Sequence, residues 1–202
     1  SSGDYKEGIK TGKWIYYYAQ GGKKEEGYFL NGKRTGTWKD YFPNSLTDDF
    51  GNTLRLEGKL FMESNYKEGK LNGERRTFGM IVQTDTSCVG SPPESKDCIK
   101  YSLLNRTMIE NYHNGVLDGR FKVYSQDGFM RKTGFYSNGK REGSWLIYIG
   151  VRNEGDTIFS KGRYVNDEKD GRWILFTGDN EDSPILYESY KDGELHGPAV
   201  SF

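Results

Sequence analysis

Short apolar and aromatic stretches recur along this chain, and polar turns containing glycine separate them. WIYYY at 14–18 and WLIYI at 145–149 each follow a glycine closely. A second turn comes next in some copies, such as QGG at 20–22 and QDG at 126–128. Short β-rich runs bounded by such turns are typical of strands joined as hairpins. The pattern therefore predicts a β-hairpin of two strands and two turns, about 24 residues long.

The same hairpin returns seven times. With the opening aromatic as position zero, the units begin near residues 5, 29, 66, 112, 136, 164 and 190. Every unit has a glycine at position seven, namely Gly12, Gly36, Gly73, Gly119, Gly143, Gly171 and Gly197. Every unit has an aromatic at position twelve, namely Tyr17, Tyr41, Phe78, Tyr124, Tyr148, Phe176 and Phe202. A unit this small cannot bury its apolar face alone, so neighbouring units are expected to stack.

The turn chemistry supports this interpretation. Position three is glycine in every unit except unit 6, which has Asp167, and Asn-Gly pairs stand at 31–32, 114–115 and 138–139. Asn-Gly accepts positive φ at both central positions of a two-residue hairpin turn. We therefore interpret the glycines of the motif as repeat-defining turn glycines.

Position nine carries the largest side chains of the repeat. They are Trp14, Trp38, Phe121, Trp145 and Trp173, whereas repeats 3 and 7 have Arg75 and Ala199. The first interpretation is a stacked structural core; the second is an exposed groove in which aromatic faces bind a glycan or a peptide. Positions nine and twelve differ in parity. Either both faces of the sheet carry aromatic columns, or a bulge changes the phase of the strand.

These observations predict an all-β fold: an elongated single-layer ribbon, or solenoid, of about seven antiparallel β-hairpin repeats in one domain over 1–202. Two insertions interrupt it, at 42–65 and 79–111. Insertions in repeat proteins often form loops on the binding side. The insertion at 79–111 is therefore a candidate contact with a partner.

The repeat resembles the MORN family, and more closely its bacterial variant, the YwqK-type antitoxin-like repeat proteins. The shared pattern is aromatic-x-(N/D/E)-G-K-x-x-G-x-W-x-x-Y, and it covers all seven units. The resemblance implies a non-enzymatic scaffold of β-hairpins. The departures at Arg75, Asp167 and Pro198-Ala199 predict less regular stacking at those places.

Composition narrows the classes of partner. The chain has 29 Lys+Arg and 29 Asp+Glu, so its formal net charge is zero. Nucleic acids and anionic membranes select a surplus of basic residues, so neither is an expected partner. The apolar runs are far shorter than the roughly 20 residues of a spanning helix, so no transmembrane segment is expected. We identify no catalytic residues, metal site or cofactor motif.

Cys88 and Cys98 are the only cysteines, and both lie in the insertion at 79–111. We expect a disulfide between them, with two free thiols as the alternative and a metal site disfavoured because further ligands are not nearby. A disulfide indicates an oxidising compartment. An extracytoplasmic location, in the periplasm or at the cell surface, is therefore favoured, and a cytoplasmic one stays open.

The sequence thus predicts a scaffold for protein–protein interaction, such as an accessory subunit of a bacterial cell-envelope complex. One alternative is an antitoxin or immunity-like binder of a cognate toxin. Another is a carbohydrate-binding surface protein that uses exposed aromatics, with a glycan as ligand.

Overall fold

The computed structural model describes residues 1–47, 53–56, 58–84, 99–103, 107–125, 128–151, 157–177 and 184–201. Fifteen hairpin strands in sequence order form an open antiparallel sheet, which confirms the predicted all-β fold of hairpin repeats. The described part of the chain contains no helix with the length and hydrophobicity of a membrane span.

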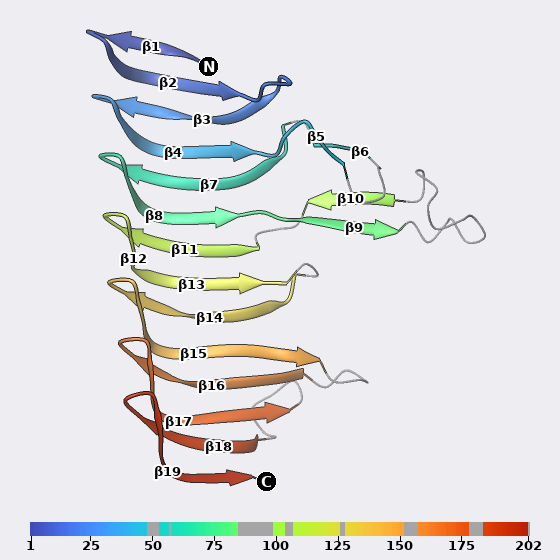
Figure 1. The fold of residues 1–202 in the computed structure, drawn as a ribbon, viewed down its shortest axis with the longest axis vertical. Coiled ribbons are helices and arrows are strands. Elements are labelled where there is room, and N and C mark those ends of the chain that lie inside the picture. Colours follow the sequence, from blue (N-terminus) through green and yellow to red (C-terminus); the bar gives the residue numbers. More distant parts are fainter. Residues whose placement is uncertain are drawn as a thin grey trace, which may run out of the picture. The chain divides into compact units, whose positions relative to one another are not determined.

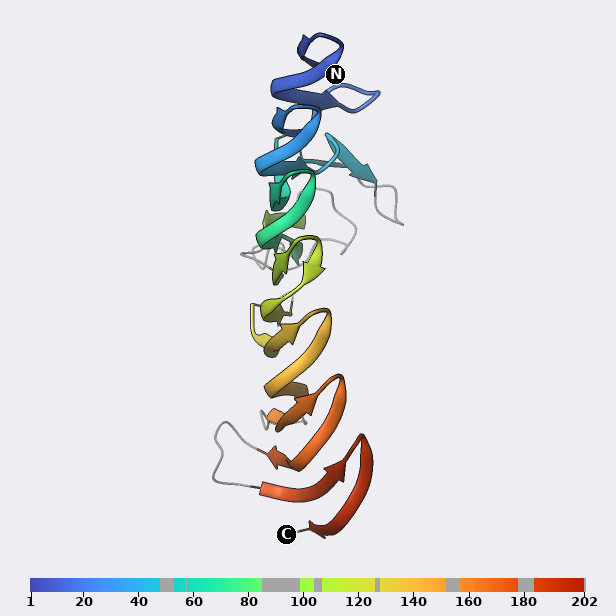
Figure 2. The same cartoon turned by 90° about the vertical axis from the view of Figure 1, so that its left-hand side faces the viewer.

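The chain divides into two compact sections. Residues 1–107 with 126–128 form the first section, and residues 108–125 with 129–202 form the second. Repeats 1–3 belong to the first section and repeats 4–7 to the second. In both sections the hairpin strands are curved along their length (Figure 2).

In the first section the sheet has the order β1-β2-β3-β4-β7-β8 (Figure 1). Its strands are β1 (Ser2–Lys6), β2 (Ile9–Tyr17), β3 (Lys23–Leu30), β4 (Lys33–Tyr41), β7 (Leu60–Lys67) and β8 (Lys70–Thr77). Each strand pairs with the next one along the chain, apart from the step from β4 to β7. That step passes over the first insertion.

The second section has the order β11-β13-β14-β15-β16-β17-β18-β19, and β12 pairs with β11. The strands are β11 (Met108–His113), β12 (Val116–Leu117), β13 (Gly119–Tyr124), β14 (Met130–Ser137), β15 (Lys140–Val151), β16 (Thr157–Val165), β17 (Glu168–Thr177), β18 (Pro184–Lys191) and β19 (Glu194–Ser201). The ladder continues through Asp167 and Pro198-Ala199. The less regular stacking expected at these two places is therefore not observed.

Each insertion forms a small hairpin of its own. β5 (Ser45–Thr47) pairs with β6 (Thr53–Arg55), and β9 (Met80–Thr84) pairs with β10 (Ile99–Leu103). Both hairpins lie at the ends of the sheet strands opposite to the turns that join β1 to β2, β3 to β4 and β7 to β8 (Figure 1). The insertions thus emerge on one side of the first section, as expected of decorations on a repeat.

The hairpin turns have the backbone that their sequence predicts. Both central residues have positive φ in every repeat, for example 50° and 74° at Asn31 and Gly32. The non-glycine residues of this kind are Glu7, Asn31, Glu68, Asn114, Asn138, Asn166, Asp167 and Asp192. This combination is that of the type I′ turn, whose twist matches the twist of the flanking strands.

The glycines at position seven have a different role from the one assigned to them as turn glycines. All seven have positive φ, from 65° at Gly36 to 112° at Gly119, but they lie within or at the start of strands. In repeat 2 the register changes from Tyr28↔Thr35 to Glu26↔Lys39, so three residues, 36–38, oppose Gly27. The glycine therefore opens a β-bulge, and the bulge places the position-nine side chain over the neighbouring strand.

The aromatics at positions nine and twelve lie on opposite faces of the sheet, as strand alternation requires. Trp38 contacts Phe29 and Tyr66, whereas the Tyr41 hydroxyl donates to Glu26. In the second section the opposite face carries a separate aromatic cluster. It comprises Tyr148, Phe159 and Phe176, with ring centroids 5.6 and 4.8 Å apart. The structure therefore agrees with the first of the two sequence-based alternatives, in which both faces of the sheet carry aromatics.

Candidate binding surface

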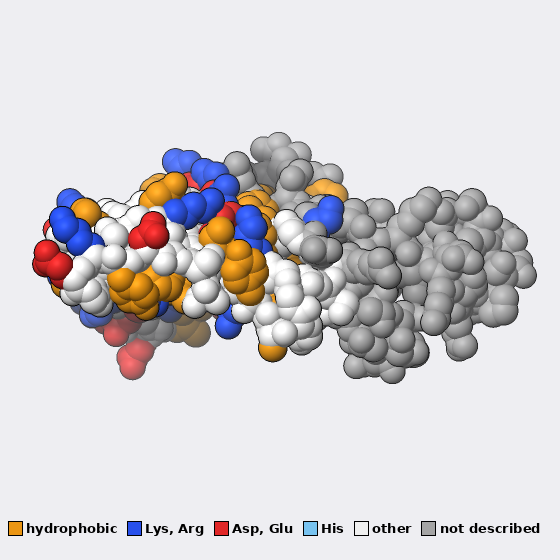
Figure 3. Space-filling view, turned by 90° about the horizontal axis from the view of Figure 1, so that it is seen from above, with side chains coloured by type: hydrophobic (Ala, Val, Ile, Leu, Met, Phe, Trp, Pro, Cys, Tyr) orange, Lys and Arg blue, Asp and Glu red, His pale blue; other side chains and the backbone are white. Residues whose placement is uncertain are grey.

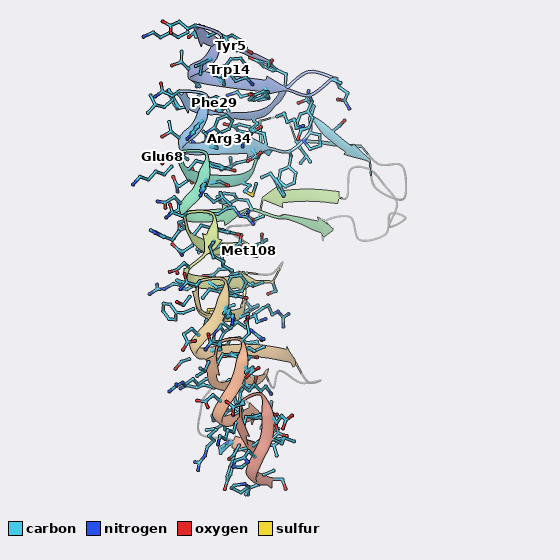
Figure 4. All side chains as sticks on the ribbon, turned by 60° about the vertical axis from the view of Figure 1, so that its left-hand side comes forward. Tyr5, Trp14, Phe29, Arg34, Glu68 and Met108 are labelled. Carbon is cyan, nitrogen blue, oxygen red and sulfur yellow. The ribbon has the colours of Figure 1, made fainter. Side chains whose placement is uncertain are left out.

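One face of the sheet carries all the tryptophans of the repeats, and we call it the tryptophan face. In the first section, rings at positions zero and nine alternate from strand to strand (Figure 4). The centroids of Tyr5 and Trp14 are 5.0 Å apart, and those of Phe29 and Trp38 are 5.1 Å apart. Both pairs meet edge to face, which is a favourable arrangement for aromatic quadrupoles.

The second section repeats this layer. Its rings follow one another as Phe121, Tyr136, Trp145, Tyr164 and Trp173, with successive centroids 5.2, 5.3, 5.8 and 4.9 Å apart. The four indoles of the chain are between 0% and 4% exposed. The position-nine tryptophans are thus the core of each section and do not form an exposed aromatic groove.

Each tryptophan lies flat over a glycine two residues before the opening aromatic. These glycines are Gly3, Gly27, Gly134 and Gly162, and a Cβ at any of them would overlap the indole ring. The φ of all four is outside the left-handed region, so the ring alone requires glycine there. Repeats 3, 4 and 7 lack tryptophan, and they have Ser64, Glu110 and Glu188 at this position.

A cation covers the aromatic layer from position five. Lys10 Nζ lies 4.3 Å from the Trp14 ring, Arg34 Cζ 4.0 Å from Trp38, and Lys169 Nζ 4.8 Å from Trp173. Arg141 instead lies 3.9 Å from the ring of Tyr164. Contacts of this kind stabilise the layer by about 0.5–2 kcal/mol each. In repeats 3, 4 and 7 position five is leucine: Leu71, Leu117 and Leu195.

The chain therefore contains two kinds of repeat. Repeats 1, 2, 5 and 6 combine glycine at position minus two, a cation at five and tryptophan at nine, and repeats 3, 4 and 7 lack all three. The sequence interpretation missed the first two positions of this set. The signal was present, since the three positions change together within the chain itself.

The hairpin turns of neighbouring repeats within a section are joined by backbone hydrogen bonds. The amide at position three donates to the carbonyl of position five of the preceding repeat, for example Gly32 N to Lys10 O at 3.0 Å and Gly193 N to Lys169 O at 3.1 Å. Asp167 keeps this bond, and its carboxylate accepts from Arg141 N at 2.7 Å and Nε at 3.0 Å. The hydrogen bond from the Arg141 backbone and the ion pair lower the pKa of Asp167 despite some desolvation. The departure from glycine thus adds a clamp between repeats 5 and 6.

A charged cluster centres on Glu26 on the opposite face of the first section. Its carboxylate lies 3.0 Å from Lys13 Nζ and 3.2 Å from Lys23 Nζ, and it accepts the Tyr41 hydroxyl. Burial opposes ionisation, but these hydrogen bonds prevail and lower the pKa of Glu26 to about 2. The stability that this cluster contributes is present above about pH 4.5 and is lost as the pH falls towards 2.

Asp40 shows the reverse behaviour on the tryptophan face. It stands directly opposite Glu25 in the ladder. Burial, and then the charge of Glu25, raise the pKa of Asp40 to about 6, although Arg34 partly compensates. A raised folded-state pKa means that the ionised carboxyl destabilises the fold. The free energy of unfolding therefore falls as the pH rises from about 3.8 to about 6.

Replacing Asp40 by asparagine removes this dependence. We expect Asp40→Asn to be more stable than the native chain by about 1 kcal/mol at pH 7, because solvent screening reduces the effect at a partly exposed carboxyl. The gain shrinks towards pH 4, and urea unfolding at several pH values measures it. The control Asp192→Asn makes the same change in an exposed turn. An equal gain at pH 4 and pH 7 for Asp40→Asn would contradict the assignment.

The tryptophan face is hollowed in the second section. A concavity of about 190 Å³ opens over β16, β17 and β18. It is lined by Ser160, Lys169, Trp173, Ile174, Leu175, Leu186 and Glu188. At the same level of this face the ladder runs Val123, Lys132, Ile147, Ser160, Leu175 and Leu186. Its four apolar side chains are partly exposed, and a lysine and a serine interrupt them.

Cys88 and Cys98 lie outside the described residues, so the disulfide stays a prediction. If it forms, the intact chain is lighter by two hydrogens than the reduced chain. Alkylation then modifies neither cysteine until a reductant is added, and mass spectrometry reads both results. Alkylation of both cysteines in protein purified without reductant, under non-oxidising handling, would contradict the disulfide and the compartment inferred from it.

Candidate metal ligands do not gather in the part of the chain that the structure describes. Within it, no three His, Cys, Asp or Glu side chains are placed to hold an ion. His113 and His196 lie near the turns of different repeats, and His113 Nε2 is 3.2 Å from Asn114 Nδ2.

Comparison with known proteins finds no family model that matches the chain and no curated protein with significant similarity.

Proposed function

We propose that this chain is a non-enzymatic repeat scaffold that binds another protein on the tryptophan face of its second section. The carrying observation is the pair of Leu175 and Leu186, which oppose each other in the ladder and are partly exposed beside the buried tryptophans, with Ile147 and Val123 further along the same level. Partly exposed apolar side chains beside a hollow support an interaction site on this face. The rigid layer beneath it limits the entropy lost on binding.

The MORN-type assignment of the repeats belongs to this proposal. The open sheet of hairpins, the paired positive-φ turns and the aromatics at fixed positions support it. Membership of that family favours a scaffold over an enzyme. An accessory subunit of a bacterial cell-envelope complex is the form we propose, and the compartment depends on the predicted disulfide.

The surface chemistry of the chain agrees with a protein partner. The end view of the first section shows hydrophobic side chains among both Lys/Arg and Asp/Glu (Figure 3). Tyr5 and Ile9 in this section are 61% and 49% exposed. A mixed surface of this kind suits a protein, whereas nucleic acid and anionic membrane select a dominant positive charge.

The carbohydrate alternative loses its main support because the tryptophan faces are buried. An antitoxin role is a special case of the proposal, in which the partner is a toxin.

Site-specific photocrosslinking tests the proposal. A photoreactive phenylalanine derivative replaces Leu186 on the tryptophan face, and in a second variant it replaces the neighbouring Tyr187 on the opposite face. In the native cells we expect a discrete protein adduct from position 186 and none of equal yield from 187. Equal adducts from both positions, or none from 186, would contradict binding on this face.

A further inference from the structure

The hollow on the second section has the size of an aromatic ring. Its volume is about 190 Å³, and a cavity of about 150 Å³ lined by apolar side chains holds benzene. Trp173, Leu175 and Leu186 give it apolar walls, and Ser160, Lys169 and Glu188 add polar groups. It is therefore suited to a ring that carries one polar atom.

The first section shows how a ring sits at the matching place. Tyr16, at position eleven of repeat 1, lies with its ring centroid 5.9 Å from that of Trp14 and 6.4 Å from that of Trp38. Lys10 Nζ donates to the Tyr16 hydroxyl at 2.8 Å. In repeat 6 the corresponding residues are Leu175, Trp173 and Lys169. The cation and the indole are kept, and leucine takes the place of the tyrosine.

Two other repeats fill this place with their own side chains. In repeat 5 the residue at position minus four is Lys132, whose Nζ lies 5.6 Å from the Trp145 ring. In repeat 2 it is Glu25, which pairs with Arg34. In repeat 6 this residue is the small Ser160, which lines the hollow beside Trp173 and does not fill it.

The polar groups around the hollow select a hydroxyl. Glu188 Oε2 accepts from the Tyr190 hydroxyl at 2.6 Å, and Lys169 Nζ donates to that same hydroxyl at 3.2 Å. A carboxylate accepts several hydrogen bonds, so Glu188 can also accept from an incoming phenol. The same pairing exists on the first section, where Glu26 accepts from Tyr41. A phenylalanine ring would leave this acceptor unused, and an anionic ring would be repelled by it.

We propose that the hollow over β16–β18 binds a tyrosine side chain of a partner protein, presented on a segment whose flanking residues are apolar. The ring packs against Trp173 and Leu186, and its hydroxyl donates to Glu188. Ile147, which opposes Ser160 in the ladder, receives a flanking apolar residue. This inference rests on the proposed scaffold function and specifies the chemistry of its partner.

The first experiment titrates the full chain with N-acetyl-tyrosinamide and follows the indole N–H signals by NMR. The chain has four tryptophans, so four indole signals are expected. The Trp173→Phe variant lacks one of them, which identifies the signal of Trp173. We expect saturable shifts of the Trp173 signal, with about tenfold weaker binding of N-acetyl-phenylalaninamide, because a hydrogen bond to a charged group is lost. No saturable shift, or equal binding of N-acetyl-leucinamide, would overturn the proposal.

Two exchanges between the sections test the internal template. Leu175→Tyr supplies a ring of the chain's own and should abolish binding of the probe. Tyr16→Leu opens the matching place over Trp14 and should add a second site, seen as a new shift of the Trp14 signal. Gly27 opposes Trp14 where Glu188 opposes Trp173, so this site should bind the tyrosine and phenylalanine probes equally. Tyr17→Leu, on the opposite face, is the matched control and should add none. Probe binding that persists unchanged in a folded Leu175→Tyr variant overturns the assignment.

The test also separates this inference from the proposed function. Native chain and Leu175→Tyr serve side by side as tagged baits. If both retain the same stoichiometric partner, the scaffold function stands and the tyrosine site is overturned. If the probe binds at Trp173 but neither bait retains a protein partner, the hollow has the chemistry inferred and the scaffold function is contradicted. Loss of the partner only in Leu175→Tyr supports both.

Discussion

Replacing Trp38 by alanine is expected to lower the free energy of unfolding by about 3–5 kcal/mol, because its side chain is fully buried and the cavity cannot close. Trp38 contacts Phe29, Tyr66 and Arg34, so it joins three strands. In a repeat array the loss falls first on the neighbouring repeats. Urea unfolding followed by circular dichroism measures the total, and hydrogen exchange locates the loss in β3, β4 and β7.

Arg75→Ala is the matched control, since it changes the same position of a repeat that has no tryptophan. Arg75 is partly exposed, and Ser64 takes the place of the glycine beneath it. We expect this change to cost about 1 kcal/mol or less. A cost for Arg75→Ala equal to that of Trp38→Ala would show that position nine contributes through the backbone and not through the indole.

Gly162→Ser is expected to destabilise the chain by about 1–3 kcal/mol through overpacking, because the added side chain meets the Trp173 ring. The φ of Gly162 is not in the left-handed region, so the cost is steric and not conformational. Thermal unfolding of the full chain measures it. For a domain of this length the expected shift of the melting temperature is about 2–4 °C per kcal/mol.

Two further variants isolate the contact between the glycine and the ring. Ser64→Gly makes the reverse change where no tryptophan lies above, and we expect an effect within about 1 kcal/mol. Gly162→Ser combined with Trp173→Ala should cost less than the sum of the single changes, because the clash disappears with the ring. Strict additivity in this cycle would contradict the packing of indole on glycine.

The sequence predicted the hairpin, its turns and the repeat period because each of these is determined locally. Asn-Gly at 138–139 specifies a turn wherever it occurs between strands, and the seven repeated glycines mark the period. The role of Gly143 was not predicted correctly, since the sequence indicated a turn glycine. Its neighbours suggest a turn, but pairing of β15 with β14 makes it the start of a bulge. A bulge depends on the register of two strands, which a single segment does not determine.

The candidate site was harder to predict because it depends on differences in side-chain size between matching positions of the repeats. Ser160 and Leu175 are unremarkable residues in the sequence, and neither is a motif. They leave a hollow because they are smaller than Lys132 of repeat 5 and Tyr16 of repeat 1, which are the residues at the same two repeat positions. By contrast, the packing of Trp145 on Gly134 can be predicted from the sequence. Each repeat with tryptophan at position nine has glycine at position minus two, and this correlation is visible without a structure.

The most direct test of the central claim, that this chain is a protein-binding scaffold, is native purification of the tagged full chain followed by mass spectrometry of what co-elutes. The scaffold function predicts one co-eluting protein in stoichiometric amount. Its complex with the chain should survive moderate salt, because salt screens charge–charge interactions and has little effect on an apolar interface. A chain that elutes alone at every salt concentration would contradict it.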